Sequence, residues 1–504
     1  MNKRPGLSLA AAALKACTAC YEPGKGRLFL RAAEGTAEKN GNEELSMKPL
    51  RIIDVVKAVG AIDYTSANRF AEINSVVFDS RKATSDSLFV PLQGETDGHD
   101  YVQSAIKNGA TATLWSRPAG EAPEEIAVIL VDDTLEALQK LAEAYLNMIQ
   151  PKVVAITGSN GKTTTKDMTA AILSARFRVH KTEGNYNNEI GMPMTILEMP
   201  EDTQVLVLEM GMSNFGEISL LSRLAKPDIA IITLIGDSHL EFLGSRLGIA
   251  KAKMEILEGL KPEGTFIYPG DEPLIADELA EESHFRQLTF GTDETAAVYA
   301  YDIVPGKTRT TFHVNLDPSV DLEIPVLGVY NVRNALAALA AAQVLDMPLA
   351  EVKEALATFQ LTANRTQWLD GVNGSQLLND AYNASPTSMT AVLRSFAKLP
   401  REGKKIAVLG DIRELGERSA ELHAGLAAEI SPEEFDQVYL YGPEMGALYE
   451  NLRTVFPEGT LYHYVGEKTP LVEKLKSELQ KADQVLIKSS FGTDLLAVVA
   501  ALRV

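Results

Sequence analysis

The sequence predicts an α/β fold with parallel sheets, divided into about three domains. Short runs of purely apolar residues alternate with helical segments in two separate series, as in sheets whose parallel strands are buried on both faces. The first series opens with a strand, a glycine-rich turn and a helix, which is typical of a nucleotide-binding domain. The length of 504 residues fits about three domains of roughly 150 residues each.

Residues 1–46 show no hydrophobic period and are expected to lie outside the fold. They contain Cys17 and Cys20, a lone C-x-x-C pair without the second pair that a structural zinc site needs. We expect a disordered extension, or a wrongly assigned start with the true start at Met47. A targeting role for the short apolar stretch after Arg4 is the alternative.

Residues 47–149 are expected to form a smaller domain of mixed structure. Three short runs have the composition of strands: Ser75–Phe78, Ser87–Leu92 and Ala127–Val131. The segment Leu135–Met148 has apolar residues three and four positions apart, which predicts an amphipathic helix.

Residues 150–360 and 361–504 are expected to form two further α/β domains. In the first of them, buried strands are predicted at Val153–Ile156, Val205–Leu208 and Ile229–Leu234. In the second, strands are predicted from Leu377 and at Ile406–Leu409, Val438–Tyr441 and Val485–Ile487, before a final helix at Leu495–Leu502.

The charge balance limits the candidate partners. With 48 Lys and Arg against 68 Asp and Glu, the formal charge is −20, and no cluster of cations provides a face for a nucleic acid. A small phosphorylated substrate needs only one or two local cations and a metal ion. Because no run of 18 apolar residues occurs, no membrane span is predicted, and we expect a cytoplasmic protein.

The segment Thr157–Thr165 reads T-G-S-N-G-K-T-T-T between a predicted strand and a predicted helix, which indicates a phosphate-binding loop. Its glycines let backbone N–H groups turn toward a phosphate at the positive end of the helix. Lys162 would neutralise the β- and γ-phosphates, and the hydroxyl of Thr163 would reach Mg²⁺. The loop is shorter than the full P-loop pattern, because Ile156 occupies the position of its first glycine.

Three further residues are candidates for the same site. Glu209 ends a predicted parallel strand, at the sheet edge where α/β proteins bind ligands, and its carboxylate would suit Mg²⁺. A solvated loop acid is the alternative. His239 follows the next strand and would reach that edge, although a lone histidine is as often structural. Lys253 lies on a predicted helix, where a solvated lysine is the default expectation.

With these segments in order, residues 47–504 resemble the Mur ligases, an ATP-dependent family that forms amide bonds in peptidoglycan precursors. The most specific matching segments are Thr182–Pro193 (TEGNYNNEIGMP), Asn379–Pro386 (NDAYNASP) and Val408–Gly416 (VLGDIRELG). Asp79-Ser80-Arg81 and Asp97-Gly98-His99 match the uridine-nucleotide domain of the family, and the short phosphate loop is the Mur form. The resemblance implies three domains, with a P-loop central parallel sheet and a Rossmann-like C-terminal domain.

The resemblance also implies a reaction and its residues. ATP activates the carboxylate of UDP-N-acetylmuramoyl-tripeptide as an acyl phosphate, and D-alanyl-D-alanine is then added, with Mg²⁺ as the cofactor. Nothing in the sequence demands more than a monomer, which is the expected state. The implied catalytic residues are Lys162, Glu209, His239 and Lys253. The implied Mg²⁺ ligands are Thr163, Glu209, His239 and, if carbamoylated, Lys253. The implied ATP-binding residues are Thr157, Gly158, Ser159, Asn160, Gly161, Lys162, Thr163, Thr164, Asn331, Asn334, Arg365 and Asp380. The implied substrate-binding residues are Ser80, Arg81, Asn185, Asn188, Tyr382 and Asn383.

The sequence departs from the family pattern in three segments. Tyr330 replaces a histidine on the adenine side and Ser385 replaces an asparagine. Lys488-Ser489-Ser490-Phe491 stands where the family commonly has Lys-Gly-Ser-Arg, so an arginine expected near the dipeptide is missing at Phe491. Two other functions stay open: a related ligase such as a folylpolyglutamate synthase, or a catalytically silent ATP-binding regulator. The sequence also leaves open lysine or diaminopimelate at the third position of the peptide, and a D-Ala-D-Ala or D-Ala-ester acceptor.

Overall fold

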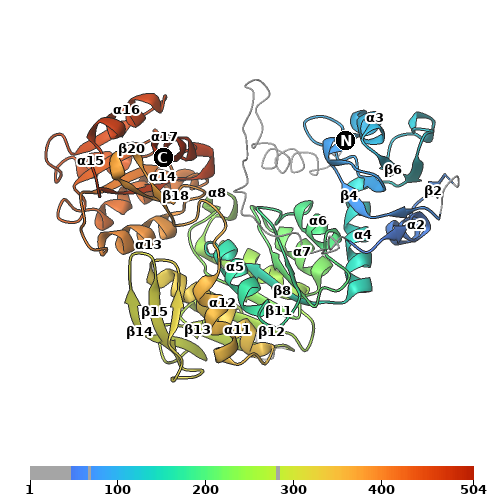
Figure 1. Cartoon of the computed structure of the whole chain (residues 1–504), viewed down its shortest axis with the longest axis horizontal. Coiled ribbons are helices and arrows are strands. Elements are labelled where there is room, and N and C mark those ends of the chain that lie inside the picture. Colours follow the sequence, from blue (N-terminus) through green and yellow to red (C-terminus); the bar gives the residue numbers. More distant parts are fainter. Residues whose placement is uncertain (1–46, 66–69, 280–283) are drawn as a thin grey trace, which may run out of the picture. The chain divides into compact units, whose positions relative to one another are not determined.

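The computed structural model describes residues 47–65, 70–279 and 284–504 (Figure 1). The expectations for residues 1–46, including Cys17 and Cys20, lie outside the described residues. The chain divides into two compact units, one made of Met1–Pro151 with Asn185–Gln204 and the other of Lys152–Gly184 with Val205–Val504. The boundaries between the three expected domains, near residues 150 and 360, remain predictions.

The first unit contains a five-stranded sheet in the order β2-β7-β6-β5-β4 and a two-stranded sheet, β1-β3. Strands β4 to β7 are parallel, and β2 is antiparallel to β7. The strands are β1 Leu50–Arg51, β2 Asp63–Tyr64, β3 Glu72–Ile73, β4 Ser75–Val77, β5 Ser87–Phe89, β6 Ala110–Trp115 and β7 Ala127–Leu130. The helices are α2 Ile52–Val59, α3 Val102–Lys107, α4 Thr134–Ile149 and α6 Gly191–Leu197. The predicted strands and the long helix are confirmed, with ends shifted by one to three residues.

Local sequence explains where α4 begins and ends. The side chain of Asp133 accepts hydrogen bonds from the backbone N–H groups of Leu135 and Glu136, which satisfies two donors that a helix start leaves free. The helix ends at Gln150, whose backbone is left-handed, directly before Pro151, which cannot continue it. Its apolar side packs on α2 and α6 within this unit.

The second unit contains a nine-stranded sheet in the order β16-β15-β14-β13-β12-β11-β8-β10-β9. The strands from β9 to β14 in this order run parallel, whereas β15 pairs antiparallel with both β14 and β16. The strands are β8 Lys152–Thr157, β9 Val179–Lys181, β10 Val205–Glu209, β11 Ile229–Ile232, β12 Thr265–Pro269, β13 Arg286–Gly291, β14 Val298–Pro305, β15 Thr310–Val314 and β16 Leu322–Ile324. The helices are α5 Lys162–Leu173, α7 Glu217–Ala225, α8 Leu240–Leu243, α9 Arg246–Met254, α10 Pro273–Glu278, α11 Val329–Val344 and α12 Leu349–Thr358.

The same unit holds a six-stranded sheet in the order β17-β18-β22-β19-β20-β21, parallel except for β17. The strands are β17 Gln367–Asp370, β18 Gln376–Asp380, β19 Lys405–Gly410, β20 Gln437–Tyr441, β21 Leu461–Tyr464 and β22 Gln484–Lys488. The helices are α13 Pro386–Ala397, α14 Ser419–Gly425, α15 Gly446–Leu452, α16 Thr469–Glu478 and α17 Leu496–Leu502. All the strands predicted in both series are present.

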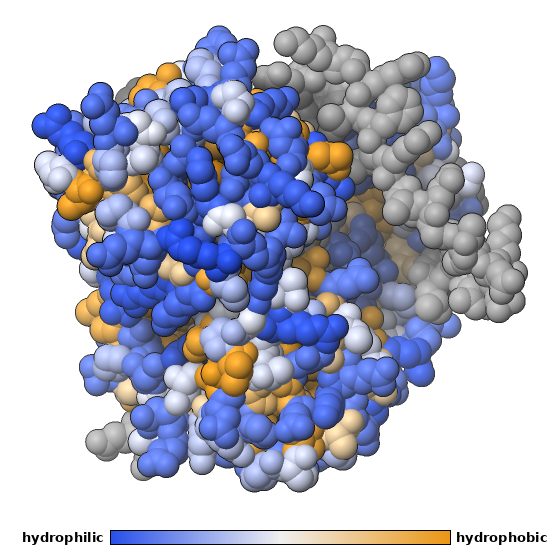
Figure 2. All heavy atoms as spheres, turned by 60° about the vertical axis from the view of Figure 1, so that its left-hand side comes forward, coloured by the Kyte–Doolittle hydropathy of each residue, from blue (hydrophilic) through white to orange (hydrophobic). Residues whose placement is uncertain are grey.

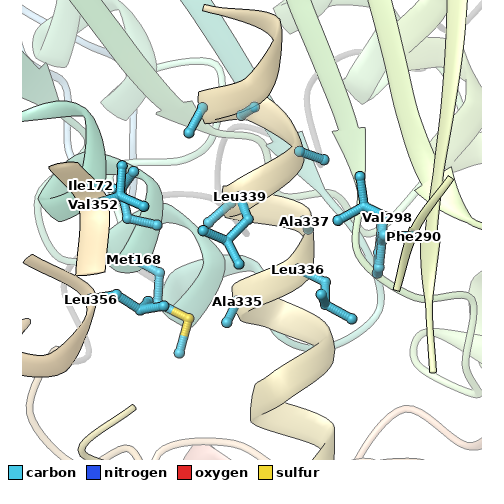
Figure 3. Packing of buried hydrophobic residues seen from close by; sticks show 14 of the residues in the cluster. Met168, Ile172, Phe290, Val298, Ala335, Leu336, Ala337, Leu339, Val352 and Leu356 are labelled. Carbon is cyan, nitrogen blue, oxygen red and sulfur yellow. The ribbon is translucent and has the colours of Figure 1, made fainter. Parts of the chain in front are cut away.

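Helix α11 lies in the core behind the nine-stranded sheet. It is apolar around most of its circumference, and every residue from Ala335 to Ala342 is buried, as expected for a helix enclosed on all sides. Figure 3 shows α11 between two groups of side chains: Met168, Ile172, Val352 and Leu356 from α5 and α12, and Phe290 and Val298 from β13 and β14. This packing fixes α5, the helix that follows the glycine-rich turn, against the sheet.

The face seen in Figure 2 is mainly hydrophilic, with hydrophobic residues in small separate patches. This agrees with a formal charge of −20 spread over the chain. Within the residues that the structure describes, no helix is long and apolar enough to cross a membrane.

Candidate functional site

A cavity of about 570 Å³ opens in the second unit, beside the glycine-rich turn that follows β8. Residues of the nine-stranded sheet and residues of the six-stranded sheet both line it. Eleven of the residues predicted from the sequence contribute to its wall: Ser159, Asn160, Gly161, Lys162, Thr163, Thr164, Asn331, Asn334, Arg365, Asp380 and Asn383. The structure therefore brings together side chains that are more than 200 positions apart in the sequence, since Ser159 and Asp380 differ by 221.

Two glycines of the loop are required by its geometry. Gly158 and Gly161 have φ values of +151° and +82°, which favour glycine. A Cβ atom on Gly158 would lie 1.9 Å from Oγ1 of Thr233, and one on Gly161 would lie 2.3 Å from Oδ1 of Asn334. Helix α5 begins at Lys162, directly after the second glycine, so its unpaired backbone N–H groups and positive dipole end face the loop. This geometry suits a bound phosphate.

Lys162 supplies a cation inside the cavity. Its Nζ donates a hydrogen bond of 2.8 Å to the carbonyl oxygen of Gly158. Burial lowers the pKa of this amine; the carboxylate of Glu209 opposes that shift and the guanidinium of Arg365 adds to it. An anion bound in the cavity would restore the charged form, because an opposite charge favours the ammonium.

Glu209 is the last residue of β10 and is only 3% exposed, so it is not a solvated loop acid. It pairs in register with Ile156 of β8, immediately before the glycine-rich loop. Its backbone N–H donates a hydrogen bond of 3.0 Å to Oγ1 of Thr182. The predicted place of Glu209 at the carboxyl end of a parallel strand is confirmed.

Arg365 provides a second cation from the segment between α12 and β17. Its Nη2 donates to Oγ1 of Thr163 at 3.4 Å, and its guanidinium lies 4.2 Å from the ring centroid of Tyr382, a cation–π contact. Its Nε is buried, and no acceptor for it exists among the residues that the structure describes. A buried donor without an acceptor points to a ligand oxygen at this place.

The start of α13 also lines the cavity. Ser385 caps this helix, with its Oγ accepting from the backbone N–H of Ser388, and Thr387 and Ser388 belong to the cavity wall. Nδ2 of Asn160, in the phosphate loop, donates to Oγ of Ser385 at 3.0 Å. The starts of α5 and α13 thus both meet the cavity, and both favour negative charge.

On another wall, α11 contributes two amides and a phenol. Nδ2 of Asn334 donates to Oδ1 of Asn331 at 3.1 Å, and Nδ2 of Asn331 donates to the carbonyl of Leu327. Burial and the nearby carboxylate of Asp380 raise the pKa of Tyr330 far above its usual value, so the phenol stays protonated at neutral pH. This wall offers hydrogen-bonding groups without net charge.

Asp380 and Lys488 end neighbouring parallel strands of the six-stranded sheet and form an ion pair of 2.5 Å. The lysine also donates to the carbonyl of Asn383 at 2.9 Å, and the other oxygen of Asp380 accepts from the backbone N–H of Thr366 at 3.0 Å. The side chain of Lys488 is 3% exposed and that of Asp380 is 13% exposed. The ion pair therefore fixes the cavity wall rather than presenting a free charge.

Lys253 is buried, contrary to the default expectation of a solvated lysine, because α9 turns this face toward the interior. Burial, and secondarily the positive charge of Lys162, hold its pKa well below the usual value. In the described part of the chain no carboxylate forms an ion pair with it. Burial therefore favours the neutral form of this amine.

His239 lies at the start of α8 with a left-handed backbone, and its Nδ1 is 2.5 Å from Oε2 of Glu414. This hydrogen bond lowers the pKa of Glu414. Across residues 47–65, 70–279 and 284–504, no three His, Cys, Asp or Glu side chains are grouped closely enough to hold a metal ion by themselves. A metal role for His239 stays a prediction.

The remaining candidates divide between the units. In the second unit, the ring of Tyr382 lies 5.8 Å from that of Phe491. In the first unit, Ser80 is buried at the start of a 3₁₀ turn, and Arg81 is exposed and pairs with Asp79 at 2.7 Å. Asn185 and Asn188 also belong to the first unit, where Oδ1 of Asn188 accepts from the backbone N–H of Gly191.

Two ion pairs of the cavity wall were not identified from the sequence. Arg333 pairs with Asp271 at 2.5 Å, and Arg246 pairs with Glu272 at 2.8 Å. Only one local signal pointed to them: Arg333 stands between the two asparagines of the segment Asn331–Asn334. Their partners come from the turn after β12, which no local pattern connects to α9 or α11.

Three family models match consecutive segments of the chain. The model described as Mur ligase family, catalytic domain, matches residues 72–146; Mur ligase middle domain matches 156–342; and Mur ligase, glutamate ligase domain, matches 364–491. The three-domain α/β architecture expected from the resemblance is confirmed.

Similar proteins support the same family. A UDP-N-acetylmuramoyl-tripeptide–D-alanyl-D-alanine ligase of Bacillus subtilis is 44% identical over 428 residues, 85% of this chain and 92% of that one. A crystal structure of MurF from Acinetobacter baumannii has a TM-score of 0.80 and 29% identity, covering 90% of this chain and 99% of that one. MurF ligase from Thermotoga maritima in complex with ADP has a TM-score of 0.74 and 29% identity, covering 85% and 96%. With a cavity built around a Mur-type phosphate loop and relatives of this similarity along nearly their whole length, the chain belongs to the Mur ligase family.

Proposed function

We propose that this chain is an ATP-dependent ligase that adds D-alanyl-D-alanine to UDP-N-acetylmuramoyl-tripeptide in peptidoglycan precursor synthesis, forming ADP and phosphate. The observation that carries the proposal is the cavity where the phosphate loop, Lys162, Arg365 and the starts of α5 and α13 converge. Relatives that match this chain along most of their length bear the name of that ligase, and one related structure is described as a complex with ADP.

The reaction has two steps at one carboxyl group. A carboxylate oxygen of the muramoyl peptide attacks the γ-phosphorus of ATP in line, the bond from that phosphorus to the bridging oxygen breaks, and ADP leaves from an acyl phosphate. The amine of the dipeptide then attacks the acyl carbon, loses a proton, and phosphate departs with the former carboxylate oxygen. Lys162 and Arg365 offset the charge that gathers on the transferring phosphoryl group. Holding the two substrates and ATP together lowers the barrier further.

Mg²⁺ fits the oxygen donors beside the phosphate loop. A hydroxyl from Thr163 and a carboxylate from Glu209 are hard ligands, and Mg²⁺ in such sites takes much of its coordination from phosphate oxygens and water. A complete set of protein ligands is therefore not required. Bound there, Mg²⁺ would neutralise phosphate charge and orient the γ-phosphate.

Lys253 suits carbamoylation. Burial shifts this amine toward its neutral form, the form that can add to CO₂ and lose a proton to give a carbamate anion. The modified side chain would carry an oxygen ligand for Mg²⁺, whereas the free ammonium would repel it. His239 is the other proposed contributor to that metal site.

The two substrates would meet the remaining candidates. We assign the uridine nucleotide to Ser80 and Arg81 of the first unit, and the muramoyl peptide to Asn185 and Asn188. Tyr382 and Asn383 would contact the incoming dipeptide. The chain would act in the cytoplasm as a monomer.

The test is phosphate release by the full chain, with ATP and Mg²⁺ and with each substrate omitted in turn. The proposal requires release to depend on both UDP-N-acetylmuramoyl-tripeptide and D-alanyl-D-alanine. Reactions with lysine or diaminopimelate at the third position of the UDP-linked peptide define the specificity for that substrate. Reactions with a D-Ala-ester in place of D-alanyl-D-alanine define the specificity for the other. Release driven by a folate with glutamate would instead indicate a folylpolyglutamate synthase. ATP binding without release in any arm would indicate a silent regulator.

A further inference from the structure

A buried carboxylate in α5 has no part in the function proposed above. The side chain of Asp167 is 1% exposed, and that of its neighbour Lys166 is fully buried. Oδ1 of Asp167 accepts a hydrogen bond from Lys181 at 3.0 Å and lies 3.3 Å from Nζ of Lys166. Lys166 also donates to the carbonyl of Thr182 at 2.9 Å. Buried charges are costly to leave unpaired, so this arrangement is held as a set.

The second oxygen of Asp167 binds the segment that joins the two sheets of the unit. Oδ2 accepts from both the backbone N–H and Oγ1 of Thr362, at 2.9 and 2.8 Å. Thr362 lies between α12 and β17. Burial would raise the pKa of Asp167, but Lys166 and Lys181 outweigh it and hold the pKa below its usual value. The carboxylate is therefore charged at neutral pH and fully hydrogen-bonded.

Two residues of α5 contact two residues of this segment. Thr163 and Asp167 are four positions apart in the helix, which puts them on one face, one turn apart. Arg365 and Thr362 are three positions apart in the segment, and each contacts one of them: Arg365 reaches Thr163 at 3.4 Å, and Thr362 reaches Asp167. Two points of attachment fix the direction of the segment, which a single contact would not do.

The backbone around Arg365 needs such an anchor. Asn364 and Thr366, on either side of it, have φ values of +66° and +46°, and a left-handed backbone is costly for a β-branched threonine. On the far side, the segment is held by the hydrogen bond from the backbone N–H of Thr366 to Asp380. On the near side, Thr362 supplies the attachment through Asp167.

We propose that Asp167 is a positioning residue for the ligase reaction: by holding Thr362 on α5, it keeps the guanidinium of Arg365 at the phosphate end of the cavity. This inference rests on the proposed function, because the guanidinium then faces the phosphates of ATP. Asp167 touches no substrate. Its effect on the reaction passes through Arg365. In a variant without Arg365, a substitution of Asp167 should therefore hardly change the rate.

The test is a double-mutant cycle with Asp167→Asn, Arg365→Ala and the double variant in the full chain. The asparagine keeps the shape and removes the charge that attracts the lysines and Thr362. We expect Asp167→Asn to lower kcat about tenfold, the loss that fits one charge-assisted hydrogen bond. In the Arg365→Ala background the same change should alter kcat less than about twofold, because coupled residues are not additive. KM for the UDP-linked substrate should stay unchanged in both backgrounds.

Two further variants separate positioning from folding. Asp228 also accepts from two lysines and a backbone N–H, those of Lys152, Lys261 and Val153, but binds no residue of the connecting segment. Asp228→Asn should therefore lower thermal stability without changing kcat. If Asp167→Asn does not fold, Thr362→Val, which removes only the hydroxyl donor, takes its place in the cycle. We expect it to lower kcat roughly threefold, and only when Arg365 is present.

The outcomes distinguish this inference from the function on which it rests. If the wild-type chain turns over and Asp167→Asn lowers kcat only when Arg365 is present, the ligase function and the positioning role are both supported. Wild-type turnover with equal losses in both backgrounds overturns the positioning role and leaves the function intact. If the wild-type chain binds ATP but does not turn over, the Kd for ATP replaces kcat as the measured quantity for the same four chains. The positioning role then requires that Asp167→Asn weaken ATP binding only when Arg365 is present. A wild-type chain that binds no ATP overturns both.

Discussion

The two parallel sheets of the second unit end in different ways at the edges that meet the cavity. At the edge of the nine-stranded sheet, Lys162 bonds to a backbone carbonyl, and Nε of Arg365, whose guanidinium contacts Thr163, has no acceptor in the described part of the chain. At the edge of the six-stranded sheet, Asp380 and Lys488 pair with each other. Both edges are rich in polar groups, and composition alone does not tell them apart.

The difference shows where a ligand belongs. Groups that already satisfy one another build a wall, whereas cations and N–H donors without anionic partners bind an anion. The loop after β8 therefore supplies a cation for the phosphate site, and the pair at the ends of β18 and β22 supplies a rigid part of the cavity wall. The following variants test this division of roles.

The largest effect is expected at the first edge. Lys162→Met removes the cation while keeping a side chain of similar length, and we expect phosphate release to fall by roughly 10²–10³-fold, the loss typical of one preorganised group that stabilises transition-state charge. Thermal stability should hardly change. The matched control is Lys251→Met, an exposed lysine that pairs with Glu278. Equal losses in the two variants would refute a specific role for Lys162.

At the second edge the same kind of change should act on folding. Lys488→Met leaves the carboxylate of Asp380 buried without its partner, which costs about 3 kcal/mol of unfolding free energy. In a Trp115→Phe background, Trp368 alone reports the unfolding of this unit by urea, since the chain has two tryptophans. The double variant Lys488→Met/Asp380→Leu should recover part of the loss. No loss in the single variant would mean that the ion pair does not build the wall.

A smaller effect tests the shape of the phosphate loop. In Gly161→Ala, a methyl group would lie 2.3 Å from Oδ1 of Asn334, at a φ of +82°. We expect the strain and the displaced asparagine to cost about 1–3 kcal/mol and to weaken ATP binding, as measured by calorimetry. Gly216→Ala is the control, because Gly216 has a φ of +85° but open space around it. A control that weakens ATP binding equally would show that the loop contact is irrelevant.

The smallest effect concerns an ion cluster in the first unit. Burial disfavours the charged form of Asp97, but hydrogen bonds from His99 and Arg117 outweigh it and lower the pKa of Asp97 to about 2, from an ordinary 3.8. A carboxylate with a depressed pKa stabilises the fold above pH 4, and this contribution disappears as the pH falls toward 2. We therefore expect Asp97→Asn to cost about 1 kcal/mol at pH 7, after allowing for partial exposure, and progressively less below pH 4.

The measurement uses Trp115, whose ring contacts His99 edge-on at 4.7 Å, as the fluorescent probe in a Trp368→Phe background. Asp100→Asn is the control, because Asp100 bonds to the same Arg117 from a more exposed position. A difference between Asp97→Asn and the wild type that grows as the pH falls would contradict the assigned shift.

How much the sequence could predict depends on how far apart in the sequence the residues of each feature lie. The strand predicted at Val205–Leu208 and the glycine-rich turn predicted between a strand and a helix are local patterns, and the structure contains both, as β10 and as the turn between β8 and α5. The burial of Lys253 was missed because a nine-residue helix with mixed polarity does not reveal its inner face. The contact between Asp167 and Thr362 spans 195 positions, and neither residue stands in a recognisable pattern. Tertiary packing decides such contacts, and a single sequence does not contain that information in local form.

The account depends most on activation of a carboxylate at the phosphate loop. The direct measurement is the fate of ¹⁸O placed in both oxygens of the reacting carboxylate of UDP-N-acetylmuramoyl-tripeptide, with ATP, Mg²⁺ and D-alanyl-D-alanine, followed by mass spectrometry of the released phosphate. An acyl phosphate requires one ¹⁸O atom to appear in each phosphate, because the carboxylate oxygen that attacked phosphorus leaves with it. Phosphate without the label would mean that water attacks ATP instead, and would contradict the ligase reaction.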